Sequence, residues 1–336
     1  MKFGPVPLDQ ALGAVLAHAV PVADGVLKKG RMLTADDLAR LAAAGRAEVI
    51  VARLEPGDVA EDAAAWRLAQ AVVPDPEAAG LSLEAPFTGR VNIRATGPGV
   101  LELDRAAIDR LNAADPMITL ASLPPWQRVA AGMMVGTVKI ISYGVPASAL
   151  ALACAAGAGA MRRLAPVVDR VDLIVTETAP GAASRDDKGV RAVWDRVARL
   201  GLPEGQTQIV AHRTADVAAA IAAARAGMVL VLTGSATSDG ADVMPAALRA
   251  AGGQVIRFGM PVDPGNLLVL GQQGGRPVIG LPGCARSPAL NGADFVLERV
   301  ACGVAVTGAD IAAMGVGGLL KEIPTRPQPR ARRPRG

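Results

Sequence analysis

The sequence predicts an α/β protein: a mostly parallel sheet with helices on both faces, three layers in all, preceded by a smaller N-terminal α/β part and a β-rich middle module. From residue 171 onward, runs of Val, Ile and Leu alternate with segments of helical spacing. Strands that are apolar along their whole length are typical of parallel sheets buried on both faces. Between residues 80 and 146, short runs separated by Gly and Pro predict the β-rich module.

The N-terminal elements follow from spacing and capping residues. Residues 8–20 place apolar groups at helical spacing, and Thr34 is the expected N-cap of a helix over 34–45 that Gly45 ends. A strand at 49–54 and a helix over 57–72 come next. The Pro-Asp-Pro segment at 74–76 predicts a linker, so we place a boundary there.

The remaining elements divide the chain further. Residues 105–114 predict the only helix of the middle module, and the Ala-rich stretch 147–161 predicts a connecting helix. Strands and helices then alternate to the end of the sheet. The predicted strands are 171–178, 206–212, 227–234, 254–259 and 276–282, and the predicted helices are 188–200, 215–226, 242–251 and one after 288. We therefore expect four parts: an N-terminal α/β region at 1–76, the β-rich module at 80–146, an α/β domain at 163–303, and an extension with a disordered basic tail at 304–336.

Composition excludes several classes of function. Only 2% of the residues are aromatic, which is too few for base-stacking platforms, so we expect no nucleic-acid partner. Five arginines at 326, 330, 332, 333 and 335 place the net positive charge in the tail. Three cysteines without a C-x-x-C pair argue against a zinc or iron–sulfur site. No segment predicts a membrane span or a secretory signal, so we expect a cytoplasmic protein.

Ligands of parallel α/β sheets bind outside the carboxyl ends of the strands, which directs attention to the loops 176–187, 233–241 and 281–288. The loop from Thr233 to Gly240 has small residues whose backbone N–H groups can face a phosphate, with a helix beginning at Asp242. The hydroxyls of Thr233, Ser235, Thr237 and Ser238 add donors. An exposed turn with Asp242 as a simple N-cap is an equally good interpretation.

The other two loops have charged residues. Arg286 can pair with a phosphate, although an ordinary Pro-Gly turn with a surface arginine explains that loop better when it is taken alone. Asp186 and Asp187 can hold Mg²⁺, and a solvated charged turn is at least as good an explanation. His212, at the end of a predicted strand, is expected to be structural.

Together, the three loops resemble the molybdopterin-binding domain shared by molybdopterin adenylyltransferases and molybdopterin molybdotransferases. The family's T-G-G-T-G followed by D-V-T-P is similar to Thr233-Gly-Ser-Ala-Thr237 followed by Asp242-Val-Met-Pro245. Its P-G-K and G-L-P-G-N-P-x-S motifs are similar to the segments 264–266 and 280–287, and its Asp-Lys-Gly to 187–189. The chain departs from these motifs at Ser235, Ala236, Asn266 and Cys284-Ala285. In addition, His212 stands where adenylyltransferases carry an aspartate.

Residues 8–54 resemble fragments of the molybdotransferase N-terminal region, without its long insert. The layout is also similar to the front half of fusion proteins that join a molybdopterin-binding domain to a nucleotidyltransferase, and that second domain is not present here. The resemblance implies a molybdopterin, or molybdenum cofactor, ligand and a homo-oligomer. It also implies partners such as a nucleotidyltransferase or a molybdoenzyme apoprotein.

We expect this protein to bind molybdopterin in cofactor biosynthesis or delivery, with Asp242 accepting from the pterin ring N–H groups. The expected ligand contacts are Thr233, Gly234, Ser235, Thr237, Ser238, Asp242, Pro282, Gly283, Arg286 and Ser287. The first alternative is a transferase, a molybdotransferase or nucleotidyltransferase, in which Asp239 and Asp242 are catalytic and, with Asp187, surround Mg²⁺. The second is a non-catalytic scaffold or regulator of a cofactor nucleotidyltransferase.

Overall fold

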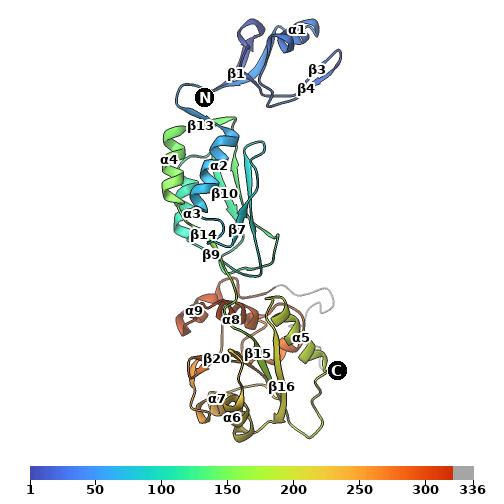
Figure 1. The fold of residues 1–336 in the computed structure, drawn as a ribbon, viewed down its shortest axis with the longest axis vertical. Coiled ribbons are helices and arrows are strands. Elements are labelled where there is room, and N and C mark those ends of the chain that lie inside the picture. The colour runs from blue at the N-terminus through green and yellow to red at the C-terminus, as the bar shows by residue number, and fades with distance from the viewer. Residues whose placement is uncertain (321–336) are drawn as a thin grey trace, which may run out of the picture. The chain divides into compact units, whose positions relative to one another are not determined.

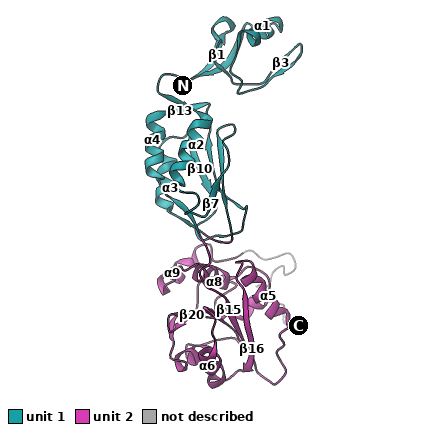
Figure 2. Cartoon of the chain, in the orientation of Figure 1, with its two compact units in different colours: residues 1–97, 101–163 teal, residues 98–100, 164–336 magenta. Residues whose placement is uncertain are grey.

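The computed structural model describes residues 1–320, and its internal contacts divide the chain into two compact units (Figure 1). Unit 1 comprises residues 1–97 and 101–163, and unit 2 comprises residues 98–100 and the chain from 164 onward (Figure 2). The tail that the sequence predicts to be disordered lies, from residue 321 to residue 336, outside the residues that the structure describes. No described helix has the length and hydropathy needed to cross a bilayer.

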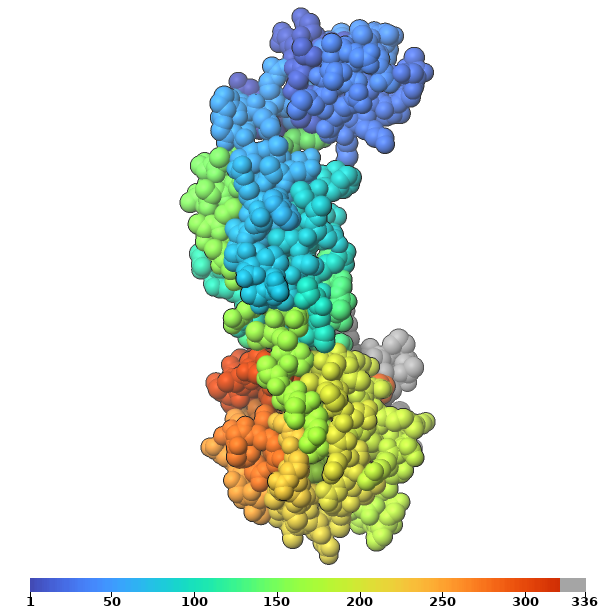
Figure 3. Space-filling view, in the orientation of Figure 1, coloured from blue at the N-terminus to red at the C-terminus, as the bar shows by residue number. Residues whose placement is uncertain are grey.

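Residues 1–53 have their own small core, and in the space-filling view they cluster together in the darkest blues (Figure 3). A three-stranded sheet has the order β1-β5-β2, beside a β3–β4 hairpin, and Leu16, Leu33 and Leu41 are buried in this core. The elements are β1 (Lys2–Pro7), η1 (Leu8–Gln10), β2 (Val15–Leu16), β3 (Val20–Val22), β4 (Gly25–Leu27), α1 (Ala35–Ala43) and β5 (Glu48–Arg53).

The helical spacing at 8–20 is misleading, because this segment contains η1, β2 and the first residue of β3 instead of a long helix. Gly13 has a positive φ of 72°, which interrupts any helix. Val15 then pairs with Ala52 in an antiparallel ladder. Pairing with a strand more than thirty residues away overrides the local spacing.

Thr34 caps α1 as the sequence predicts, and its hydroxyl accepts from the backbone N–H of Asp37 at 3.3 Å. We expect Thr34→Ala to lower the free energy of unfolding by about 1 kcal/mol, because one N-terminal donor loses its partner. Chemical denaturation of unit 1 measures this. Asp36→Ala is the matched control in the same turn and should cost less, about 0.5 kcal/mol, through the helix dipole alone. Equal effects of the two variants would contradict the capping role.

Residues 58–164 share a second core that includes Leu68, Ile93 and Leu111. The sequence analysis instead divided this stretch at 74–76, between an N-terminal region and a β-rich module at 80–146. The largest sheet of residues 58–164 has the order β10-β12-β8-β7, and smaller sheets have the orders β11-β9-β14 and β13-β6. The elements are β6 (Asp58–Ala60), α2 (Glu61–Val72), β7 (Leu81–Leu83), β8 (Arg90–Ala95), β9 (Gly99–Leu103), α3 (Arg105–Ala113), β10 (Ile118–Ser122), β11 (Arg128–Val129), β12 (Met134–Ile140), β13 (Gly144–Pro146), α4 (Ala147–Ala156) and β14 (Met161–Leu164).

The connecting helix predicted over 147–161 is shorter than expected. Helix α4 ends at Ala156 with Gly157 as its C-cap, and Gly159 has a positive φ of 66°. The chain then turns into β14, which lies next to β9. Glycines at the end of an alanine run therefore end this helix, although the run itself suggested that it continued.

Unit 2 contains a six-stranded, mostly parallel sheet with the order β16-β15-β17-β20-β19-β18, which confirms the predicted sheet type. The first four strands are parallel to one another, β19 is antiparallel to β20, and β18 is antiparallel to β19. The sequence analysis missed β19. The elements are β15 (Val171–Glu177), α5 (Lys188–Ala198), β16 (Glu204–Ala211), α6 (Thr214–Ala223), β17 (Met228–Leu232), α7 (Val243–Ala250), β18 (Gln254–Phe258), β19 (Val269–Gln273), β20 (Arg276–Leu281), η2 (Gly283–Arg286), α8 (Gly292–Ala301), α9 (Gly308–Ala312) and η3 (Ala313–Gly315).

Alternate residues of the central strands of unit 2 belong to two different cores. Leu173 and Leu230 pack with residues of α5 and α8. Ile174 and Val229 pack with residues of α6 and α7. Because successive strand residues point to opposite faces, the strands are buried on both sides, and polar groups can collect only where the strands end.

Candidate functional site

Four parallel strands end at one edge of the sheet of unit 2. β16, β15, β17 and β20 are neighbours that run in the same direction (Figure 1). Their carboxyl ends lead into His212 and into the loops 178–187, 233–242 and 282–291. The three loops that the sequence selects therefore follow neighbouring strands and leave the same sheet edge, where α/β proteins bind ligands.

A cavity of about 190 Å³ lies at this edge. The end of β15 and all three loops contribute to its wall, which includes six ionisable or hydroxyl-bearing side chains in addition to backbone groups. The lining residues are Val175, Thr176, Glu177, Thr178, Ala182, Ala183, Ser184, Asp187, Gly234 and Arg286. Three residues predicted from the sequence, Asp187, Gly234 and Arg286, thus come from three different loops and meet at one cavity.

Gly234 is packed against the end of β15. Its backbone N–H donates to Thr176 Oγ1 at 2.7 Å. A Cβ atom at position 234 would lie 2.6 Å from the carbonyl oxygen of Thr176, closer than such atoms approach. Glycine is therefore required here by the close approach of two backbone segments.

Thr176 links three strand ends, although the sequence analysis did not single it out. Its side chain is buried, and Oγ1 lies 2.8 Å from His212 Nδ1 in addition to accepting from Gly234. A threonine hydroxyl has two acceptor positions and one donor, so it can serve both neighbours. His212 therefore helps to hold the loop that begins at residue 233, which agrees with its expected structural role.

Asp242 is the N-cap of α7, as the sequence allows. One carboxylate oxygen accepts from the Val243 N–H at 2.7 Å, and the other accepts from the Ser238 N–H at 3.0 Å. These two N–H groups hold the pKa of Asp242 below its usual value, and the nearby His212 contributes in the same direction. Asp242 is therefore ionised at neutral pH and can only accept hydrogen bonds.

Arg286 and Asp187 form an ion pair at the cavity. Arg286 Nη1 lies 3.6 Å from Asp187 Oδ1, and both side chains are partly exposed. Arg286 Nη2 donates to the carbonyl oxygen of Thr233 at 3.1 Å. Asp187 is also the N-cap of α5, and its Oδ1 accepts from the Gly189 N–H at 2.6 Å. The arginine thus bridges two loops while its guanidinium borders the cavity.

The other predicted site residues belong to the same loops without lining the cavity. They differ in exposure, so the hydroxyls of the 233–241 loop do not form a single polar surface. Thr233, Thr237 and Pro282 are buried, Ser287 and Asp242 are half-buried, and Ser235, Ser238, Asp239 and Gly283 are exposed.

Comparison with known protein families agrees with this geometry. Residues 170–301 match a family model described as "Probable molybdopterin binding domain". This segment belongs to the molybdopterin-binding domain family. The resemblance drawn from the loops is thereby confirmed for unit 2. Residues 5–53 match a domain of unknown function, DUF8806.

Two solved structures are similar to the chain at low identity. The molybdopterin biosynthesis MoeA protein from Pyrococcus horikosii is 16% identical with a TM-score of 0.33, over 90% of this chain and 75% of that one. A molybdenum cofactor biosynthesis protein from Pyrococcus furiosus is 13% identical with a TM-score of 0.24, over 93% of this chain and 65% of that one, less than two thirds of its length. No curated protein sequence matches. The family assignment therefore rests on residues 170–301.

In the molybdopterin-binding domain, a buried arginine that the sequence analysis missed fixes one wall loop. Arg196 of α5 donates to Asp294 Oδ1 at 2.6 Å in a buried ion pair. It also donates to the carbonyl oxygens of Ala285, Ser287 and Ala289 at 2.9, 2.7 and 2.9 Å. The backbone on both sides of Arg286 is therefore tied to α5. An arginine among the valines of a predicted helix was the signal available in the sequence.

The carboxylates expected around Mg²⁺ are separately engaged in this domain. Asp239 Oδ1 accepts from the Ala241 N–H at 2.7 Å, and Asp187 and Asp242 cap helices as described above. Within residues 1–320, no three or more His, Cys, Asp or Glu side chains are grouped so that they could hold a metal ion. Magnesium at Asp187 stays a prediction from the sequence.

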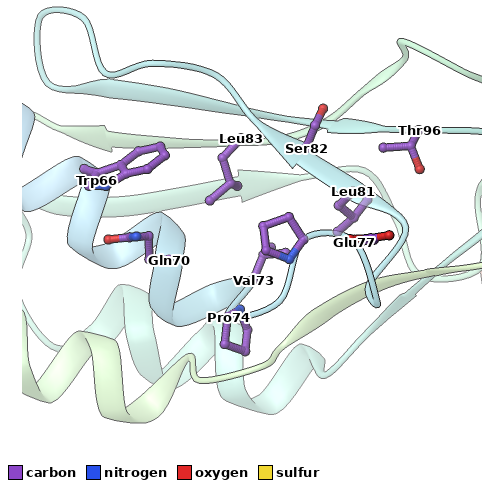
Figure 4. A pocket seen from close by; sticks show the side chains of 10 residues that line it. Trp66, Gln70, Val73, Pro74, Glu77, Leu81, Ser82, Leu83 and Thr96 are labelled. Atoms are coloured by element: carbon purple, nitrogen blue, oxygen red, sulfur yellow. The ribbon is translucent and has the colours of Figure 1, made fainter.

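A larger cavity, of about 560 Å³, lies in unit 1 and contains none of the predicted site residues. Trp66 and Gln70 project from α2 on one side, and Leu81, Ser82 and Leu83 belong to β7 on the other (Figure 4). Most of its lining side chains are apolar. The molybdopterin-binding domain is therefore not the only part of the described chain with a sizeable surface hollow.

Proposed function

We propose that this protein binds molybdopterin at the cavity edge of unit 2 and acts in molybdenum cofactor biosynthesis or delivery. The observation that carries the proposal is the meeting of Asp187, Gly234 and Arg286, from three loops, at one cavity in a segment of the molybdopterin-binding domain family. Arg286 supplies positive charge for the ligand's phosphate. Asp242 accepts from the pterin ring, and the loops at 233–238 and 282–287 provide the remaining contacts.

We also propose a domain arrangement and protein partners for this chain. We infer the three-layer arrangement of the family for unit 2, which the two cores on opposite faces of the sheet support. We likewise propose the four-part division of the chain and a homo-oligomer. The bound cofactor would pass to a nucleotidyltransferase or to a molybdoenzyme apoprotein.

Extraction of the bound ligand tests the proposed function directly. The full chain is purified from a host that makes the molybdenum cofactor, and the extract is oxidised and examined for pterin fluorescence. We expect a pterin signal in proportion to the protein. Arg286→Gln, purified in the same way, should retain much less of it. An extract without pterin from folded wild-type protein would contradict the proposal.

Asp242→Asn should weaken binding of purified molybdopterin by about tenfold, because a hydrogen bond to an ionised acceptor is worth about 1.5–3 kcal/mol and a neutral one less. Each carboxylate oxygen of Asp242 accepts from one N–H group and has capacity for a further hydrogen bond. Asparagine is also a good N-cap, so α7 should stay intact. Fluorescence titration measures the affinity.

The pH dependence of the same titration follows from the lowered pKa of Asp242. The carboxylate form is present above the ordinary aspartate pKa of about 3.9. The contribution of this carboxylate to pterin binding is therefore complete at neutral pH. It is lost only as the pH falls through the lowered pKa of Asp242.

Asp195→Asn, an exposed change on α5, is the matched control for Asp242→Asn. Unchanged affinity in Asp242→Asn would count against Asp242 as a pterin contact.

A further inference from the structure

We propose that the cavity of unit 2 binds the phosphate group of its ligand without a divalent cation, and that Asp187 acts as an internal anion that the phosphate displaces from Arg286. This inference rests on the proposed function and adds the chemistry of the phosphate contact. It departs from the sequence expectation that Asp187 holds Mg²⁺.

The available carboxylates do not suit Mg²⁺. This ion requires a near-octahedral set of oxygens at about 2.0–2.1 Å, usually with one or two carboxylates free to bind it. Asp187 Oδ1 already accepts from the Gly189 N–H and faces a guanidinium 3.6 Å away. A second cation placed at that oxygen would be repelled by Arg286.

The other two candidate ligands are turned toward the protein itself. Both oxygens of Asp242 accept backbone N–H groups, from Ser238 and Val243. Asp239 is exposed, and its Oδ1 accepts from the Ala241 N–H. These carboxylates serve to fix the turn and the start of α7. They do not form a metal site together with Asp187.

Arg286 is well placed to supply the positive charge instead. One of its N–H groups is fixed on the Thr233 carbonyl oxygen. Its side-chain stem packs on Gly189, where an added Cβ would lie 2.8 Å from Arg286 Cγ. An arginine has five N–H donors, so donors remain for a ligand in the cavity that the residue lines. A guanidinium located in this way can bind two phosphate oxygens at once.

Asp187 is a weak competitor for that guanidinium. The 3.6 Å separation is longer than a hydrogen bond, and both side chains are partly exposed, so the attraction is screened. A phosphate monoester carries nearly two negative charges and three acceptor oxygens. It can therefore replace the single carboxylate oxygen. Asp187 keeps its separate role as the cap of α5 through the Gly189 N–H.

The two mechanisms predict opposite signs for Asp187→Asn. If Asp187 competes for Arg286, removal of its charge tightens phosphate binding, by about two- to fivefold, as expected for a surface ion pair. If Asp187 holds Mg²⁺, the same change weakens binding and removes any dependence on Mg²⁺. Asparagine still accepts from Gly189, so α5 keeps its cap. Asp195→Asn is the matched control, because Asp195 is exposed on α5 and is not among the residues that line the cavity.

The experiment measures binding of inorganic phosphate to the full chain by calorimetry, once with EDTA and once with MgCl₂. We expect the wild-type affinity to differ by less than about twofold between the two conditions. Arg286→Gln should weaken it by about tenfold, Asp187→Asn should tighten it, and Asp195→Asn should leave it unchanged. Thermal unfolding checks that each variant is folded.

Three results would overturn the inference: tenfold tighter binding with Mg²⁺, an Asp187→Asn variant that binds no more tightly than wild type, or no detectable phosphate binding. Parallel titrations with purified molybdopterin separate this inference from the proposed function. Phosphate binding with the expected signs but no binding of molybdopterin would refute the proposed ligand and leave the metal-free anion site in place. Molybdopterin binding that requires Mg²⁺ would refute the metal-free anion site and leave the proposed ligand in place.

Discussion

Arg196→Met should lower the free energy of unfolding of unit 2 by about 3–5 kcal/mol, because it leaves a buried carboxylate without its partner. Asp294 has 5% exposure, so its carboxylate would lose the guanidinium in a place where little water can replace it. The carbonyl oxygens of Ala285, Ser287 and Ala289 would also lose their donor. The loop that contains Arg286 should then open more easily than the rest of the unit.

Hydrogen exchange measures both consequences, because the peptides of each unit are observed separately. We expect faster exchange throughout α5 and α8, and the largest local increase at residues 283–290. Arg199→Met, an exposed change at the C-cap of the same helix, should alter stability by no more than about 0.5 kcal/mol. If the two variants exchange alike, the buried pair does not stabilise the unit.

A charge-conserving variant separates charge from geometry at this position. Arg196→Lys keeps one positive charge for Asp294. A single ammonium group, however, cannot reach both Asp294 and the three loop carbonyl oxygens that the planar guanidinium contacts. We therefore expect it to preserve part of the stability while the 285–289 loop still exchanges faster. A lysine variant with wild-type loop protection would show that only the charge matters.

The sequence predicted the strands of unit 2 well because each is buried on both faces, so their apolar runs are nearly continuous. β15 and β17 are fully apolar in their centres. β19 was missed although its first residues are buried, since its short apolar run ends in Gly271 and two glutamines. β19 also follows β18 directly in the chain, so no helix precedes it to mark its start.

The loops of the site could be located from the sequence, and their contacts could not. Strand order follows from general rules for α/β sheets, so residues 187, 234 and 286 were expected at one edge. The bond between Thr176 and Gly234 joins positions 58 apart, and that between Arg196 and Asp294 joins positions 98 apart. No spacing rule connects such pairs. Thr176 was hidden because it continues the strand, and Arg196 because helices commonly carry exposed arginines.

Gly234→Ala should destabilise the loop after β17 by about 1–3 kcal/mol and weaken ligand binding by tenfold or more. The added Cβ would lie 2.6 Å from the Thr176 carbonyl oxygen, and this contact involves backbone that no rotamer change can move away. Either β17 and β15 separate at their ends or the loop turns outward. Both responses break the 2.7 Å bond from the Gly234 N–H to Thr176 Oγ1 and reshape the cavity.

Gly240→Ala provides the matched control in the same loop. A Cβ at position 240 meets no atom within 4 Å and its φ is not in the left-handed region, so this change should be neutral or stabilising by about 0.4–1 kcal/mol through the unfolded chain. Thermal unfolding and titration with inorganic phosphate compare the two variants. Because the clash is with the carbonyl oxygen, adding Thr176→Ala to Gly234→Ala should not restore binding. Restoration by that second change would mean that the threonine side chain, not the backbone approach, requires glycine at 234.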